Sequence, residues 1–202
     1  MKRVYLSISL ILLTALLGFL VVIGFLMVPT AGAIIKQGAF TFQTPATLGR
    51  PPQGVAVEDA VNLDLKSIGM QCLETNQVSW IDNVRIGPRA TAFEATYVGE
   101  IGQADLTVIE FETQPDATKF FNQWSDVISD GLQIFHLETN LPGWLGQGHI
   151  QRTYNPHIGK AYNAWQIENW VTIIEVPGPL SQAMPRAQQI KQLVSQSYTG
   201  RQ

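Results

Sequence analysis

An uncharged run near the amino terminus limits what this chain can fold into more than any other feature of its sequence. Residues 4–28 carry no charge, and only two serines and one threonine interrupt the aliphatic and aromatic run. At 1.5 Å per residue a helix of this length spans about 37 Å, which crosses the roughly 30 Å hydrocarbon core of a bilayer with some tilt. Pro29 ends the helix because it lacks an amide hydrogen. We therefore predict a transmembrane signal-anchor helix in residues 1–30 that contacts lipid through residues 4–28.

The charges around this run set its expected orientation. Lys2 and Arg3 precede it, and positively charged flanks stay on the cytoplasmic side. Tyr5 is expected to sit at the same membrane interface. The alternative is a cleaved signal peptide, because residues 31–33 have the small-x-small pattern of a processing site. Secretory apolar regions are only about 7–15 residues long, so we favour a retained single-pass anchor, with the amino terminus cytoplasmic and the remainder extracytoplasmic, as in a periplasmic domain.

Composition divides the remainder of the chain into a connector and a folded body. Residues 31–43 are rather apolar, and residues 44–54 are rich in proline and glycine, so residues 31–54 read as a juxtamembrane segment and linker. Residues 55–202 are then long enough to bury a core of their own. The chain after Lys36 has ten basic and sixteen acidic residues. This acidic excess leaves no basic surface for nucleic acid, so nucleic acid is not an expected partner.

The pattern of apolar residues predicts an α+β body. β-Branched and aromatic residues gather in six segments separated by turn residues. The predicted strands are residues 79–86, 91–98, 106–112, 147–154, 161–167 and 170–176. The predicted helices are a short one within 55–69, one that is capped by Thr113 and Asp116 and stops at Gly131, and one over 181–198 with Pro185 in its first turn or at its start.

The order of these elements repeats. Each half reads as three strands followed by a helix, and the strand segments 108–111 and 173–176 resemble each other. The βββα order favours a single antiparallel sheet covered by two main helices over alternating βαβ units.

No motif for catalysis, a metal or a cofactor stands out. The three histidines form no H-x-H or H-x-x-x-H pair, and the single cysteine, Cys72, excludes a disulfide-built fold or a Cys-ligated zinc module. There is no G-x-S-x-G elbow and no phosphate-loop spacing. We therefore expect a non-enzymatic protein without cofactor or metal, in which Cys72 is a buried apolar residue.

The best candidate for recognition is the segment 140–154. Trp144 lies in a loop bracketed by proline and glycine, close in sequence to His149, Arg152 and Tyr154. Trp, Tyr and Arg dominate the energetics of protein interfaces, so these four residues are the predicted partner-binding group. The alternative is that Trp144 folds back over a sheet edge and covers the core. The other tryptophans are expected in core or cross-strand packing: Trp80, Trp124, Trp165 and Trp170.

These observations support three functions in decreasing order. The first is a non-catalytic accessory or stabilising subunit that docks through its extracytoplasmic domain on a larger membrane complex, such as an energy-converting or transport assembly. The second is a membrane-tethered ligand-binding or sensory domain with a pocket between the sheet and the loop at residues 140–148. The third is an enzyme whose site is not recognisable from the sequence.

Overall fold

The computed structural model describes residues 48–100, 102–129, 135–140 and 148–200. The predicted membrane span at residues 4–28, its flanking residues Lys2, Arg3 and Tyr5, and the loop residue Trp144 all lie outside these ranges. Among the helices in these ranges, none is long and apolar enough to cross a membrane.

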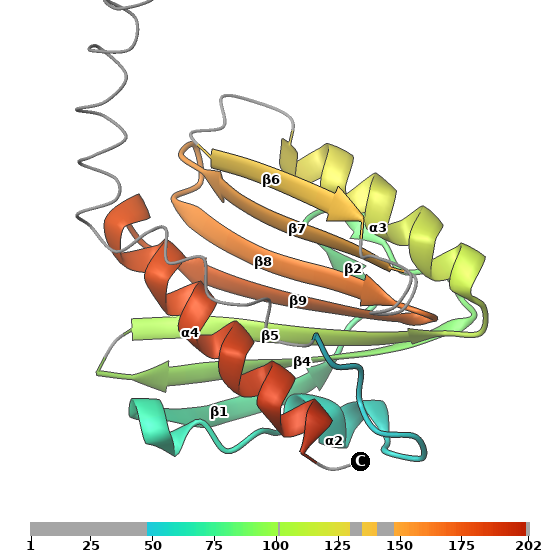
Figure 1. The fold of residues 1–202 in the computed structure, drawn as a ribbon, viewed down its shortest axis with the longest axis horizontal. Helices are drawn as coiled ribbons and strands as arrows, with labels where there is room; N and C mark the ends of the chain where they lie inside the picture. The colour runs from blue at the N-terminus through green and yellow to red at the C-terminus, as the bar shows by residue number, and fades with distance from the viewer. Residues whose placement is uncertain (1–47, 101, 130–134, 141–147, 201–202) are drawn as a thin grey trace, which may run out of the picture. The chain divides into compact units, whose positions relative to one another are not determined.

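A large antiparallel sheet organises the described residues into an α+β fold, as predicted (Figure 1). Its seven strands have the order β1-β4-β5-β9-β8-β7-β6. The strands are β1 (Met70–Gln77), β4 (Ala90–Gly99), β5 (Gly102–Phe111), β6 (Phe135–Asn140), β7 (Gly148–Asn155), β8 (Lys160–Ile167) and β9 (Trp170–Pro177). A separate two-stranded hairpin is made by β2 (Trp80–Ile81) and β3 (Val84–Arg85). The helices are α2 (Val57–Val61), the 3₁₀ turn η1 (Lys66–Ile68), α3 (Gln114–Ser129) and α4 (Leu180–Thr199).

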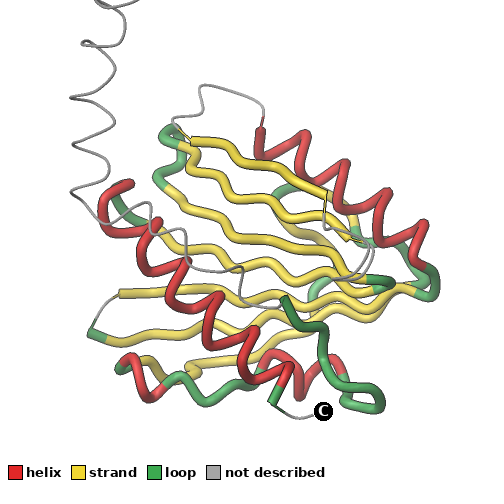
Figure 2. Tube along the Cα trace, viewed as in Figure 1, coloured by secondary structure: helices red, strands yellow, loops and turns green. Residues whose placement is uncertain are grey.

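The sheet separates two apolar cores because successive side chains of a strand point to opposite faces. On β5, Leu106 and Val108 belong to the core beneath α4 and α2, whereas Ile109 and Phe111 belong to the core beneath α3. Figure 2 shows α4 crossing one face of the sheet. The two main helices therefore cover opposite faces, and the described part of the chain has three layers.

Helix α3 begins as its sequence predicts. The backbone N–H of Asp116 donates to Thr113 Oγ1 at 3.3 Å, and the Thr113 hydroxyl donates to Asp116 Oδ2 at 2.7 Å. This reciprocal arrangement satisfies one amide of the first turn, which has no partner within the helix. Phe121 and Trp124 are fully buried on the face that packs on the sheet.

Helix α4 begins earlier than predicted. Its first residue is Leu180, so Pro185 lies inside the helix and not in its first turn. A proline inside a helix leaves the carbonyl four residues earlier without its usual donor. Here that carbonyl belongs to Ser181, and both Ser181 and Pro185 are exposed, so water can reach the freed oxygen.

The predicted helix within 55–69 is shorter than expected, because α2 ends at Val61. The Tyr97 hydroxyl donates to the carbonyl of Val61 and accepts the N–H of Leu63 at 2.7 Å. This buried hydroxyl binds the backbone groups that the next helical turn would need. The chain then turns so that Leu63 and Leu65 enter the core beneath α4 and α2.

The strands differ from the prediction in three places. Residues 79–86 form a hairpin and not one strand, because Asp82 and Asn83 adopt left-handed φ angles of 46° and 67°, as in the tight turns that suit two-residue hairpins. Strand β1 was not predicted: it is an edge strand whose residues are almost all exposed, so its sequence shows no apolar alternation. Strand β6 was not predicted either.

The additional strand β6 also changes the predicted repeat. The second half has four strands before its helix and not three. The strands that precede the two helices, β5 and β9, pair with each other in antiparallel orientation at the middle of the sheet, with Leu106 opposite Ile174.

Candidate functional site

The structure separates the residues predicted to bind a partner. Arg152 and Tyr154 are each an odd number of positions from His149 along β7. Their side chains therefore point to one face of the sheet, and that of His149 points to the other. His149 stacks on Phe121 of α3, with the ring centroids 6.0 Å apart, and the Tyr154 hydroxyl donates to the carbonyl of Gly178 at 3.1 Å. The described members of the group therefore do not form one continuous surface, and their part in partner binding stays a prediction.

The most clearly built surface feature is the β2–β3 hairpin, which sits on the α3 side of the sheet. Asp82 in its turn accepts two hydrogen bonds from the core, one from Trp124 Nε1 at 2.9 Å and one from the Tyr162 hydroxyl at 3.2 Å. Trp124 and Tyr162 are both 0% exposed. Ile81 and Val84 add apolar contacts to the same core. A carboxylate and two apolar side chains thus fix a hairpin whose strands are only two residues long.

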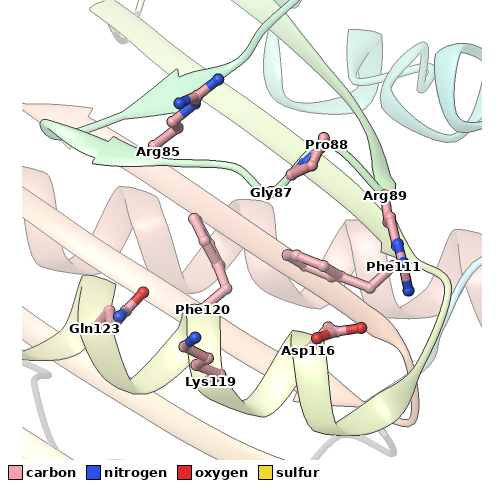
Figure 3. Close-up of a pocket in the computed structure, with 9 residues that line it drawn as sticks. All are labelled: Arg85, Gly87, Pro88, Arg89, Phe111, Asp116, Lys119, Phe120 and Gln123. Carbon is pink, nitrogen blue, oxygen red and sulfur yellow. The ribbon is translucent and has the colours of Figure 1, made fainter.

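A hollow of about 370 Å³ opens between this hairpin and the amino-terminal half of α3, and we call it the corner hollow. It is lined by Arg85, Gly87, Pro88, Arg89, Phe111, Asp116, Lys119, Phe120 and Gln123. In Figure 3 the β3–β4 connection forms one side and α3 the other, with the two phenylalanine rings between them. Phe111 and Phe120 are buried and their centroids are 5.5 Å apart, so the floor of the hollow is apolar and its rim is polar.

Three cations stand around the corner hollow. They are Arg85 at the end of β3, Arg89 just before β4 and Lys119 in the second turn of α3. Asp116 is the single carboxylate among its lining residues, and it already accepts a hydrogen bond from the hydroxyl that caps α3. Arg89 forms an ion pair with Glu112 at 3.7 Å, but both side chains are more than half exposed, so water screens this pair strongly.

A second hollow of about 500 Å³ adjoins the first, and we call it the Trp80 hollow. The two share Arg85, Gly87 and Pro88, and the second adds Trp80 and the start of the connection from β1. Trp80 and Arg85 are direct partners across the hairpin, and the Arg85 guanidinium carbon lies 6.0 Å from the centroid of the Trp80 ring. The Trp80 side chain is 56% exposed. Trp80 is therefore not in the core, and it fits the cross-strand alternative of our prediction through its contact with Arg85. Trp124, Trp165 and Trp170 are buried.

Sequence reasoning missed the corner hollow because its parts are distant along the chain. Arg85 and Arg89 precede β4, whereas Lys119 follows β5, and only the pairing of β4 with β5 brings them together. One local signal was available. Gly87-Pro88 indicates a turn, and Arg85 and Arg89 lie on either side of it, so two positive charges are close together.

A row of acidic side chains crosses the α3 face of the sheet near the hairpin turn. Asp105 of β5 lies opposite Glu175 of β9, and Glu175 forms an ion pair with Lys160. Burial raises the pKa of both Glu175 and Glu94 above the ordinary value, and the hydrogen bonds that they accept from Lys160 and from Thr107 lower it again in part. These contacts are internal to the sheet and hold its strands in register.

The opposite face holds two partly buried cations, Lys191 and Arg152. Lys191 on α4 is partly buried, and burial followed by the nearby charge of Arg152 lowers the pKa of its ammonium group to about 8. Burial also lowers the pKa of Arg152. Asn163, the direct partner of Arg152 across β7 and β8, is 1% exposed and makes no hydrogen bond through its side chain.

Metal ligation has no visible site in the described ranges, which hold no group of three or more His, Cys, Asp and Glu side chains suited to a metal ion. Cys72 is exposed on β1, so our expectation that it is buried is wrong. Strand β1 shows why: its register shifts between Cys72 and Glu74, and nearly all of its side chains are in solvent.

Comparison with known proteins identifies a fold and no family. No family model matches the chain, and no curated protein matches it. Among solved structures, a GTP-binding regulator from Thermotoga maritima aligns with a TM-score of 0.55 at 18% sequence identity, over 74% of this chain and 91% of that one. The extracellular domain of PknH from Mycobacterium tuberculosis aligns with a TM-score of 0.46 at 15% identity, over 73% of this chain and 98% of that one.

Proposed function

We propose that this chain is a membrane-tethered ligand-binding protein whose extracytoplasmic domain takes up a small anionic molecule in the corner hollow. The observation that carries the proposal is the clustering of cations. Three of the ten basic residues that follow Lys36 surround one hollow, in a body that contains sixteen acidic residues. Such a gathering of one sign of charge against the overall balance attracts ligands of the opposite sign.

The shape and chemistry of the hollow support a small ligand. Its volume of about 370 Å³ lies in the range usual for small-molecule sites. The floor made by Phe111 and Phe120 offers apolar contact, while Arg85, Arg89 and Lys119 offer charged donors to a carboxylate or phosphate. An apolar floor with a few convergent polar groups is the usual composition of such sites.

The proposal is tested by calorimetric titration of the full-length chain in detergent with inorganic phosphate, citrate and benzoate. The informative variant is Arg85→Gln combined with Lys119→Gln. Its matched control is Lys66→Gln with Arg186→Gln, which removes the same charge at positions outside the hollow. We expect the first variant to bind at least about tenfold more weakly, because each charged hydrogen bond contributes about 1.5–3 kcal/mol, and the control to bind normally. Equal loss in both variants, or no binding of any probe, would refute the site.

The accessory-subunit function is a second candidate, and the exposure of Trp80 favours it. An exposed tryptophan beside an arginine has the composition of an interface hot spot. A photo-cross-linking amino acid placed at position 80 in native membranes should then form a discrete adduct with one neighbouring protein, whereas the same amino acid at position 66 should not. Identical adduct patterns at both positions would count against docking through this surface.

A further inference from the structure

We propose that the ligand of the corner hollow also carries a planar aromatic ring, and that this ring stacks on Trp80 while its anionic group lies between Arg85 and Lys119. The inference rests on the proposed function and names the chemical class of the ligand: an aromatic ring joined to a carboxylate or phosphate. Three features of the described residues support it.

The first feature is the unusual placement of Trp80. Trp124, Trp165 and Trp170 are at most 5% exposed, whereas Trp80 is 56% exposed. Its ring lines the Trp80 hollow, so the exposed aromatic surface faces a hollow and not a convex part of the molecule. Aromatic ligands stack on such surfaces in an offset or tilted geometry.

The second feature is the continuity of the two hollows. Arg85, Gly87 and Pro88 line both of them, so a molecule that reaches from one to the other passes the Arg85 side chain. The Arg85 guanidinium already lies over the Trp80 ring. An anion held by Arg85 is therefore close to any ring stacked on Trp80, which requires the two groups of the ligand to be joined by a short linkage.

The third feature is the rigidity of the platform. A hairpin of two short strands is only marginally stable by itself. Here the Asp82 carboxylate joins the turn to the fully buried side chains of Trp124 and Tyr162. The left-handed turn at Asp82 and Asn83 sets the register that places Trp80 opposite Arg85. The hairpin backbone that carries the ring and the cation is therefore already ordered, so it loses little conformational freedom when a ligand binds, which increases affinity.

The test compares matched pairs of probes that differ in the ring alone. Indole-3-acetate and cyclohexylacetate are both carboxylates, and AMP and ribose 5-phosphate are both phosphates. Each is titrated into the full-length chain in detergent. We expect the aromatic member of at least one pair to bind about tenfold more tightly, as stacking on an aromatic side chain commonly provides. Preference within the first pair identifies an aromatic carboxylate, and preference within the second identifies a nucleotide-like ligand.

Variants at Trp80 separate stacking from charge. Trp80→Leu should abolish the preference for the aromatic member and leave the affinity for the non-aromatic member unchanged, whereas Trp80→Phe should keep most of the preference. Both variants should fold, because the side chain is mainly in solvent. If the anions bind but the ring confers no advantage, or if Trp80→Leu retains it, this inference is wrong and the proposed function stands. If none of the four probes binds, both are wrong.

Discussion

Replacing Lys191 by methionine should make the protein more stable at neutral pH, although it removes a charged side chain. Lys191 lies on α4 and is partly buried, and the pKa of its ammonium group is lowered to about 8 by burial and by the charge of Arg152. In the unfolded chain the same group has its ordinary pKa of about 10.4. At pH 7 the Lys191 side chain is therefore still mostly charged in the folded protein, where its surroundings disfavour the charge. Methionine fills a similar volume without a charge.

The size of the effect follows from proton linkage. A group whose pKa is lower in the folded state binds more protons when unfolded, so stability rises with pH between the two pKa values. One pKa unit corresponds to about 1.4 kcal/mol, so the charged Lys191 costs about 3 kcal/mol at pH 7. Between pH 7.5 and pH 9.5 this cost falls by about 2 kcal/mol. The wild-type protein should gain that amount over this interval, and Lys191→Met should not.

The measurement is equilibrium unfolding of the full-length chain by urea, followed by tryptophan fluorescence at several pH values. The interval stops at pH 9.5 because burial raises the pKa of Tyr97 to about 12, and ionisation of that tyrosine in the unfolded chain opposes the lysine effect at higher pH. Lys66→Met is the matched control, because Lys66 is exposed. A variant at position 191 that is less stable than the wild type at pH 7, or that keeps the rise in stability with pH, would show that the ammonium group is well solvated.

Four further outcomes are expected. Asp82→Ala should cost about 3–5 kcal/mol in urea unfolding, because two buried donors lose a charged acceptor, whereas Asp82→Asn should cost less, since it keeps one acceptor and tolerates the left-handed turn. Trp124→Ala should cost about 3–5 kcal/mol by the same assay, and Trp124→Phe should cost less; equal losses would contradict the packing role of the ring. Glu94→Gln should raise stability at pH 7 but not near pH 4, since a raised carboxyl pKa makes stability fall as pH rises; a constant difference across pH would exclude that cause. Trp144→Ala should weaken partner binding, measured by copurification, more than thermal stability, and equal thermal destabilisation by Trp144→Ala and Trp124→Ala would refute a recognition role.

Sequence patterns predicted the elements whose causes are local. The start of α3 depends on Thr113 and Asp116, which are three residues apart and bind each other directly. Strands β4, β5, β8 and β9 are buried enough for their apolar residues to be evident in the sequence. Strand β1 could not be recognised in this way, because its hydrogen bonds to β4 hold it in place while its side chains remain in solvent.

The candidate site depends on distant contacts, and sequence patterns predicted little of it. Trp80 resembles any other tryptophan in a β-rich segment, and it is exposed because Ile81 beside it points into the core, so that Trp80 points the opposite way. The hairpin turn is held by Trp124 and Tyr162, which come from two other elements. No pattern within the segment 79–86 indicates which partners will fix it.

The pairing of β5 with β9 affects how the chain can reach this fold during synthesis. Leu106 pairs with Ile174, and α3 and three other strands are made between them. Until β9 has emerged, a nascent first half exposes the unpaired edge of β5, and such an edge can pair with another chain. Because the contacts that close the sheet are so far apart in sequence, its assembly should be slow and should follow completion of the polypeptide. A fragment truncated after α3 should consequently aggregate instead of folding into an independent half.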